Sequence, residues 1–116
     1  MKQIGDRGEA IAKDFLRKQG YKVLETNFRV HRIGEIDLVA QDGETLVFVE
    51  VKYRKSIAFG RPEEYVDKRK RERLIRAAKA YLLKHTDHKA VRFDVVAVTG
   101  EMKAPQVRHI PNAFWA

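Results

Sequence analysis

The sequence has no cysteine and little proline or glycine, and each shortage excludes a class of protein. Without cysteine there is no disulfide scaffold, no thiolate zinc finger and no thiol nucleophile. Three prolines and seven glycines, beside 44% hydrophobic residues, argue against a disordered chain. No apolar run approaches the ~20 residues that a membrane span needs, and the N-terminus lacks a signal-peptide core. We therefore expect a folded, cytoplasmic protein that does not enter a membrane.

Length and charge narrow the class further. A chain of 116 residues is long enough to bury one sizeable core, so we expect a single domain over residues 1–116. Its 24 Lys and Arg residues exceed its 16 Asp and Glu residues, which gives a formal net charge of +8. This excess favours a polyanionic partner, although charge alone does not separate DNA from RNA or from an acidic protein.

Hydrophobic periodicity predicts two helices and five strands. The expected elements are a helix at 6–19, strands at 21–30, 35–40 and 45–53, a helix at 67–85, and strands at 92–99 and 106–110. Breakers at 54–62 predict a loop, Asp67 suits an N-cap, and the aromatic tail 111–116 is expected to pack back onto the domain. The helix at 67–85 crosses between the third and fourth strands, so these two are expected to run parallel in an α/β fold.

Ionisable groups interrupt the apolar strand at 35–40. Alternation along a regular strand places Glu35 and Asp37 on one face and Ile36 and Leu38 on the other. Asp37 is a candidate for the chemistry of a functional site. Glu35 is either a further member of that site or a plain surface charge.

The strand at 45–53 repeats the pattern. Alternation puts Glu50 and Lys52 on the same face as Phe48, between valines that point the other way. If this strand pairs with its predecessor through the tight turn between them, the two acidic faces adjoin. Asp37, Glu50 and Lys52 then share one small patch.

Such a patch predicts a divalent cation and a phosphodiester substrate. Neighbouring carboxylates repel each other, and a cation bound between them relieves that cost. The carboxylates, together with the backbone carbonyl of Val51, are ligands that Mg²⁺ accepts while it keeps several waters. The metal lowers the pKa of a bound water and neutralises charge on a phosphoryl oxygen. Lys52 stands where it could orient that water.

Each of these residues also has a plainer interpretation. Glu50 and Lys52 could belong to a solvated strand edge, and Asp37 could face solvent on a half-exposed hairpin. Glu9 follows Asp6 at capping-box spacing, so Glu9 could serve only to satisfy the start of the first helix. Spacing alone leaves these alternatives open.

Other charged residues outline a basic surface beside the candidate site. The residues expected to bind nucleic acid are Arg54, Lys55, Arg61, Lys68, Lys70 and Arg73. None of the four histidines has the spacing of paired metal ligands, and each is expected to be structural or exposed. Asp94 begins a buried strand and is expected to cap or to pair with a neighbouring arginine, in preference to a catalytic role.

These residues resemble known nuclease signatures. Glu9 on the first helix, Asp37, and Glu50-Val51-Lys52 resemble the signature of the PD-(D/E)XK superfamily. More closely, several stretches look like the YraN-like bacterial family, whose members are described as similar to endonucleases and archaeal Holliday junction resolvases. Those stretches are Gly5-x-x-Gly8-Glu9-x-x-Ala12, Asn27-Phe28-Arg29, Gly34-Glu35-Ile36-Asp37-Leu38, Phe48-Val49-Glu50-Val51-Lys52, Arg92-Phe93-Asp94-Val95-Val96 and Asn112-Ala113-Phe114.

The resemblance implies a restriction-endonuclease-like fold, a mixed β-sheet flanked by α-helices in the order α-β-β-β-α-β-β. It implies that Glu9, Asp37 and Glu50, with the carbonyl of Val51, bind Mg²⁺ or Mn²⁺, and that Lys52 assists the attacking water. The implied activity is metal-dependent hydrolysis of DNA, including branched or junction DNA in repair or recombination, leaving 5′-phosphate and 3′-hydroxyl ends. A symmetric homodimer would place two active sites on two strands.

One residue departs from the superfamily pattern: Ile36 precedes Asp37 where the superfamily name has proline, a position that varies across the superfamily. The rival expectations are a non-catalytic nucleic-acid-binding module with the same fold, and a basic domain that docks onto an acidic protein.

Overall fold

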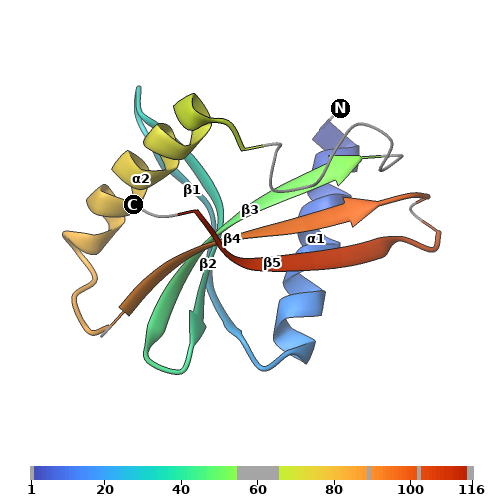
Figure 1. Ribbon diagram of the computed structural model, residues 1–116, viewed down its shortest axis with the longest axis horizontal. Helices are drawn as coiled ribbons and strands as arrows, with labels where there is room; N and C mark the ends of the chain where they lie inside the picture. The colour runs from blue at the N-terminus through green and yellow to red at the C-terminus, as the bar shows by residue number, and fades with distance from the viewer. Residues whose placement is uncertain (1, 55–65, 89, 102, 115–116) are drawn as a thin grey trace.

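Two helices flank a five-stranded sheet in the computed structural model, which describes residues 2–54, 66–88, 90–101 and 103–114 (Figure 1). The elements in chain order are α1 (Lys2–Lys18), β1 (Lys22–Val30), β2 (Gly34–Asp42), β3 (Thr45–Arg54), α2 (Lys68–Leu82), β4 (Ala90–Thr99) and β5 (Gln106–Phe114). This confirms the predicted α/β order. Most of the loop predicted at 54–62 lies outside the described residues.

The largest differences from the predicted boundaries are at the start of α1 and at the end of β5, which continues to Phe114 where a tail was predicted from 111. Helix α1 begins at Lys2, so Asp6 lies inside it and cannot be its N-cap; the capping-box interpretation of Glu9 was wrong. Asp67 does cap α2, and its Oδ1 accepts a hydrogen bond of 2.8 Å from the backbone N–H of Lys70. Neither helix in the described ranges is long and apolar enough to cross a membrane.

The strands lie in the sheet in their chain order, β1-β2-β3-β4-β5. The pair β3 and β4 is parallel, as predicted, and the other neighbouring pairs are antiparallel. Helix α2 forms the crossover connection that a parallel pair requires. The sheet is therefore mixed, with its parallel pair in the interior.

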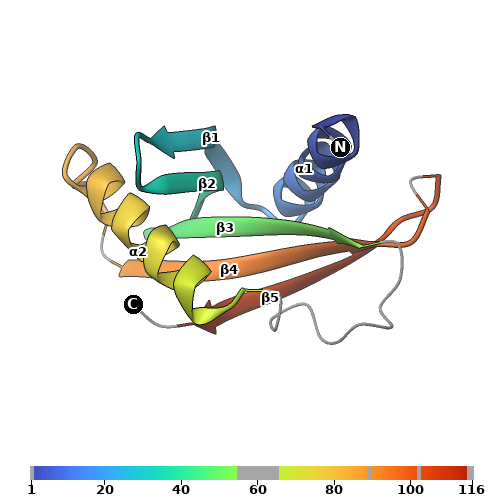
Figure 2. The ribbon, with the colours of Figure 1, turned by 90° about the horizontal axis from the view of Figure 1, so that it is seen from above.

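The sheet buries apolar side chains on both faces, so β3 alternates between two cores. Phe48 belongs to the core under α2, which also holds Tyr81, Phe93 and Phe114. Val49 belongs to the core under α1. The two helices therefore cover opposite faces (Figure 2). Phe114 stacks on Phe93 with ring centroids 4.9 Å apart, which confirms the expected packing of the tail as far as that residue; 115–116 lie outside the described residues.

Strand β2 breaks its alternation at Asp37. Ile36 packs in the core under α2 whereas Leu38 packs in the core under α1, so the prediction that both share one face was wrong. The reason is that the β2–β3 ladder ends at the pair Leu38 and Val49. Beyond it, the backbone N–H of Val51 donates to the Asp37 carboxylate at 2.8 Å. Figure 2 shows the β1–β2 hairpin rising away from β3 towards its turn.

Candidate active site

The candidate site lies where β2 leaves β3. Glu50 continues the buried run of β3, and strand alternation turns its side chain to the face that α2 covers, so it is only 4% exposed. Asp37 lies half-buried on β2, just past the last paired residue of the ladder. The two carboxyl groups lie close enough for Asp37 to raise the pKa of Glu50. The predicted meeting of Asp37 and Glu50 therefore occurs, at the divergence of the strands.

The environment of Glu50 disfavours its ionised form. Its pKa is raised to about 8, mainly by burial and in addition by the neighbouring Asp37. The positive charges of Lys70 and Lys52 act in the opposite direction. Near neutral pH the metal-free Glu50 carboxyl therefore holds its proton.

Lys70 is the cation that lies nearest to Glu50 in the described residues. Its Nζ is 3.3 Å from Oε2 of Glu50, an ion pair whose geometry makes no hydrogen bond. Oε2 is thus a buried acceptor without a hydrogen-bond donor, and within the described ranges no other buried side-chain polar atom lacks one. An unsatisfied buried acceptor is costly in free energy, and a bound cation would satisfy it.

Lys70 was predicted only as a nucleic-acid contact, and its contact with Glu50 was not predicted. The spacing of buried residues on α2 could have indicated that Lys70 points to the sheet. Leu74 and Ala78, buried on α2, follow Lys70 at successive four-residue intervals, so Lys70 starts the helix face that points to the sheet. The β3–α2 crossover then brings this first turn over Glu50.

The donor set fits a hard divalent cation. Carboxylate oxygens of Asp37 and Glu50 and the carbonyl of Val51 are the ligand types that Mg²⁺ and Mn²⁺ prefer. The unsatisfied Oε2 of Glu50 is an independent sign that this position suits a cation. In the described part of the chain, no three His, Asp or Glu side chains gather as a preformed metal-binding group.

Glu9 lies on α1, on the face of the sheet opposite α2, and within the described residues it does not gather with Asp37 and Glu50 into a group of three carboxylates. It is half-buried and lines a small cavity together with Lys13 of α1 and Asn27 of β1. The β1–β2 register places Asn27 opposite Asp37. Glu9 therefore lies one strand away from Asp37.

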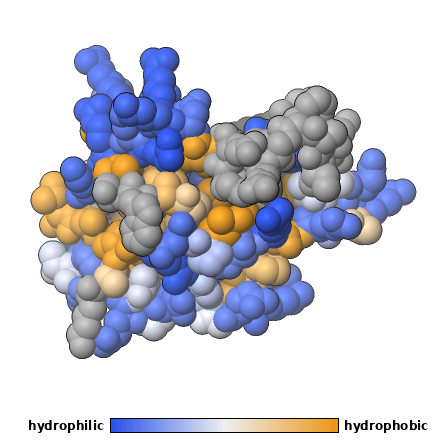
Figure 3. Space-filling view, in the orientation of Figure 1, coloured by the Kyte–Doolittle hydropathy of each residue, from blue (hydrophilic) through white to orange (hydrophobic). Residues whose placement is uncertain are grey.

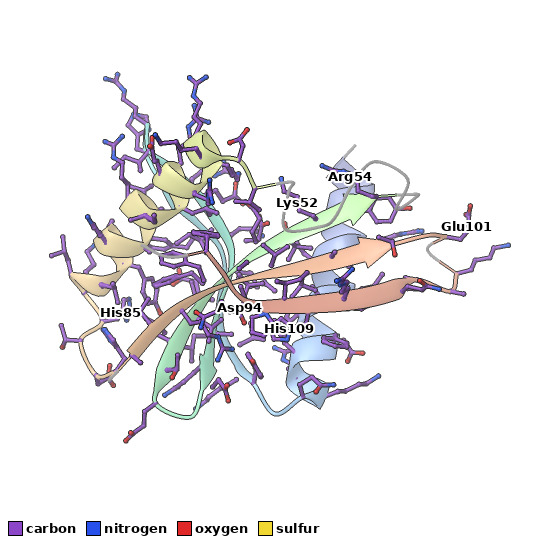
Figure 4. The ribbon with its side chains drawn as sticks, in the orientation of Figure 1. Lys52, Arg54, His85, Asp94, Glu101 and His109 are labelled. Carbon is purple, nitrogen blue, oxygen red and sulfur yellow. The ribbon has the colours of Figure 1, made fainter. Side chains whose placement is uncertain are left out.

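The remaining predicted residues surround the pair unequally. Lys52 is half-buried near the end of β3, close enough for its charge to affect Glu50 (Figure 4). Arg54 is also half-buried, and its Nη1 donates to the carbonyl of Tyr53 at 2.7 Å. Lys68 and Arg73 are exposed on α2. The predicted nucleic-acid contacts at positions 55 and 61 lie outside the described residues.

Two open assignments are settled by their partners. Arg29 donates to Glu35 at 3.2 Å on the exposed hairpin, so Glu35 is a paired surface charge. Asp94 accepts two hydrogen bonds from Arg92, at 2.9 and 3.0 Å, which confirms the expected arginine pairing. Figure 4 shows Asp94 beside His109, whose Nε2 lies 2.7 Å from it.

Asp94 is fully buried at the centre of a polar network. Burial acts to raise its pKa, but the hydrogen bonds from His109, Arg92 and the backbone of Asn112 outweigh that effect, so the pKa is lowered. Arg92 also donates to the hydroxyl of Tyr21. The network ties β4 and β5 to the start of β1 and is structural.

The sequence is similar to a family of bacterial proteins. The family model of the Uncharacterised protein family UPF0102 matches residues 8–98, which include Glu9, Asp37, Glu50 and Lys52. A UPF0102 protein of Geobacter metallireducens is 46% identical over 114 residues, covering 97% of this chain and 93% of the relative. One of Anaeromyxobacter dehalogenans is 48% identical over 112 residues, covering 96% and 83%. One of Caldicellulosiruptor bescii is 43% identical over 118 residues, covering 98% of both.

Proposed function

The chain belongs to the uncharacterised protein family UPF0102, and we propose that it is a metal-dependent endonuclease that hydrolyses phosphodiester bonds in DNA. The observation that carries this proposal is the Asp37–Glu50 carboxyl pair, with its buried unsatisfied oxygen and two nearby lysines. A buried carboxyl beside a second carboxyl destabilises a fold, so such pairs concentrate at sites that bind a ligand.

In this proposal Asp37, Glu50 and the carbonyl of Val51 would hold Mg²⁺ or Mn²⁺. Glu9 on α1 would be a further ligand, approaching from the other side of the sheet. When bound, the cation neutralises charge on the phosphoryl group and lowers the pKa of a bound water. The Val51 N–H keeps the Asp37 carboxylate oriented through its hydrogen bond of 2.8 Å.

Lys52 and Lys70 would have different roles. Lys52 would donate a hydrogen bond to the attacking water or to a non-bridging phosphate oxygen. In the free protein the Lys70 ammonium lies 3.3 Å from Oε2 of Glu50. With a divalent cation held at Glu50, this ammonium would be available to a phosphate oxygen of the substrate.

The proposed reaction is a hydrolysis. The water oxygen forms a bond to phosphorus on the side opposite O3′ and releases a proton to the solvent, while the bond between phosphorus and O3′ breaks. O3′ takes up a proton from the solvent and becomes the 3′-hydroxyl end, and the other strand end keeps the 5′-phosphate. Positioning and charge stabilisation supply most of the rate, because the chain needs no covalent intermediate for this step.

The test is cleavage of labelled single-stranded, duplex, flap and four-way-junction DNA with Mg²⁺ or Mn²⁺. Wild type is compared with Asp37→Asn, and Asp14→Asn serves as the matched control because Asp14 is an exposed carboxylate paired with Lys18 on α1. We expect metal-dependent cutting by wild type and Asp14→Asn, and a loss of at least about a hundredfold in Asp37→Asn. Equal cutting by Asp37→Asn would overturn the proposal and indicate a contaminating nuclease.

A non-catalytic nucleic-acid-binding module is the second candidate. The observation that favours it is the Lys70–Glu50 ion pair, which already places a positive charge against the carboxylate that a metal would use. This candidate predicts steep salt dependence of DNA binding with no cutting of any substrate in the panel.

Branched DNA is the substrate form that we propose. The molecule measures 38 × 30 × 23 Å, a small surface on which to hold a four-way junction. A symmetric homodimer would set one site on each of two strands. Light scattering with and without junction DNA tests this part, and a monomer under both conditions would count against it.

A further inference from the structure

We propose that the nucleic-acid strand reaches the Asp37–Glu50 pair along a basic groove between the β1–β2 turn and α2. This inference rests on the proposed function and adds the path of the substrate. The basic groove is the hollow lined by Arg29, His31, Arg32, Glu35, Lys70 and Arg73, together with the apolar residues Val30, Ile33 and Leu74. Its turn side was not among the predicted contacts.

The groove is built by a close approach of two segments. Its volume is about 490 Å³, with residues 29–35 on one wall and the first turns of α2 on the other. A Cβ atom added to Gly34 would lie 3.5 Å from Cβ of Arg73, so the turn passes α2 with room for little more than a glycine. In Figure 3, hydrophilic side chains project over this turn and over the start of α2.

The charge of the lining fits a phosphodiester backbone. The lining contains one carboxylate, Glu35, which is paired with Arg29. It contains four cationic side chains, those of Arg29, Arg32, Lys70 and Arg73. Guanidinium groups bind phosphate oxygens in a bidentate manner. The apolar lining residues suit the sugar units between phosphates. Cations spread along a groove match a polymer of phosphates better than a single free phosphate.

Lys70 connects the groove to the candidate site. It lines the groove, and its Nζ is 3.3 Å from Oε2 of Glu50. A strand lying in the groove therefore presents a phosphate beside Lys70, next to the carboxyl pair. The groove is the approach to the site and not a separate patch.

Arg32 supplies an independent sign of function. Its backbone φ is 63°, in the left-handed region that asparagine and glycine occupy more readily than arginine. Asparagine or glycine would adopt this turn conformation at a lower conformational cost than arginine. Strained positions of this kind concentrate where a side chain has a functional role.

The test is DNA binding in EDTA, where no cutting occurs. The groove variant is Arg32→Asn with Arg73→Ala, and the matched control is Arg17→Ala with Arg108→Ala, which removes two exposed arginines from α1 and β5. Fluorescence anisotropy with labelled oligothymidylate and with duplex DNA is followed from about 50 to 200 mM KCl.

We expect the groove variant to bind at least about tenfold more weakly, with the salt slope reduced by roughly two, and the control to stay within about threefold of wild type. We also expect Arg32→Asn alone to weaken binding while the thermal midpoint stays equal or rises. Equal losses in the groove and control variants would overturn the inference, as would displacement of DNA by polyglutamate at equal charge concentration.

Failure of this inference is distinguishable from failure of the proposed function. If Asp37→Asn binds DNA normally and nothing is cut, while the groove variant loses binding, the nuclease proposal fails and the groove stands. If wild type cuts DNA and the groove variant binds and cuts as well as wild type, the groove fails and the nuclease proposal stands.

Discussion

At the scale of single residues, the buried carboxyl of Glu50 couples protonation, stability and metal binding. Its side chain is 4% exposed, and its pKa of about 8 means that the folded protein holds a proton which the unfolded chain, at the ordinary value of 4.5, releases. Stability linked to this proton is fully present below about pH 4.5 and is lost as the pH rises to about 8. The site thus weakens the metal-free fold at neutral pH.

The substitution Glu50→Gln tests this linkage, because glutamine keeps the shape of the protonated carboxyl and cannot ionise. Without divalent cations, the variant is expected to exceed wild type in free energy of unfolding by on the order of 2 kcal/mol near pH 9, and to match it near pH 5. Urea unfolding in EDTA at both pH values provides the measurement. The control is Glu101→Gln, an exposed carboxyl in the turn after β4. Equal gains at both pH values would contradict the linkage.

Metal binding should depend on the same proton. A divalent cation binds the ionised carboxylate, so the affinity of wild type for Mn²⁺ is expected to rise about tenfold per pH unit from about pH 6 to 8 and then to level off. Calorimetric titrations in two buffers of different ionisation enthalpy would report the released proton. A Mn²⁺ affinity that is independent of pH, or that survives in Asp37→Asn, would rule out the pair as the binding position.

At the scale of secondary-structure elements, the first turn of α2 sets the position of Lys70. Asp67 accepts the backbone N–H of Lys70 at 2.8 Å, and Lys70 in turn lies against Glu50. Substituting Asp67→Ala removes the cap and is expected to lower the free energy of unfolding by about 1 kcal/mol. Asp67→Asn keeps an accepting oxygen and should cost little. Urea denaturation of both variants decides, and an asparagine variant as unstable as the alanine variant would exclude capping as the cause.

The elements were predictable from the sequence because their physical signals are local. Apolar runs on both faces marked the interior strands, and the helix between β3 and β4 required a parallel pair. The break of alternation at Asp37 was not predictable, because the two-residue period of side chains assumes a regular strand with an unbroken ladder. Here a side-chain carboxylate replaces a backbone acceptor for Val51, which no pattern of hydrophobic letters reveals.

At the scale of the whole molecule, the Asp94 network holds the two ends of the fold together. Asp94 is fully buried, and its partners come from β4, β5 and, through Arg92, from Tyr21 before β1. Removing the Asp94 carboxylate leaves the mostly buried Arg92 with only the more exposed Asp42, 3.4 Å away, as a counter-ion. We therefore expect Asp94→Asn to lower the free energy of unfolding by about 3 kcal/mol near neutral pH.

The pH dependence of this loss follows from the lowered pKa of Asp94. Its contribution is present above the unfolded value of 3.8 and is lost as the pH falls through the lower native value. The gap in stability between wild type and Asp94→Asn should thus be constant above about pH 5 and shrink in stronger acid. Unfolding curves from about pH 2 to 7 would show this, and a gap that persists unchanged at the lowest pH would contradict it.

The candidate site was predictable in part. Asp37 and Glu50 were expected to meet because a hairpin brings neighbouring strands into register, and they do. The role of Lys70 depends on how α2 crosses the sheet, which is a tertiary property. The turn wall of the basic groove depends on the approach of Gly34 to Arg73, two segments distant in sequence. Long-range contacts of this kind leave no local signal.

We propose that the protein hydrolyses DNA with a divalent metal held by Asp37 and Glu50. The most direct measurement is single-turnover cleavage by wild type and Asp37→Asn at protein concentrations that give equal DNA occupancy, with Mg²⁺ and then with EDTA. The account predicts cutting by wild type only with Mg²⁺, and no cutting by the variant at the same occupancy. Cutting in EDTA, or cutting by Asp37→Asn at the rate of wild type, would contradict it.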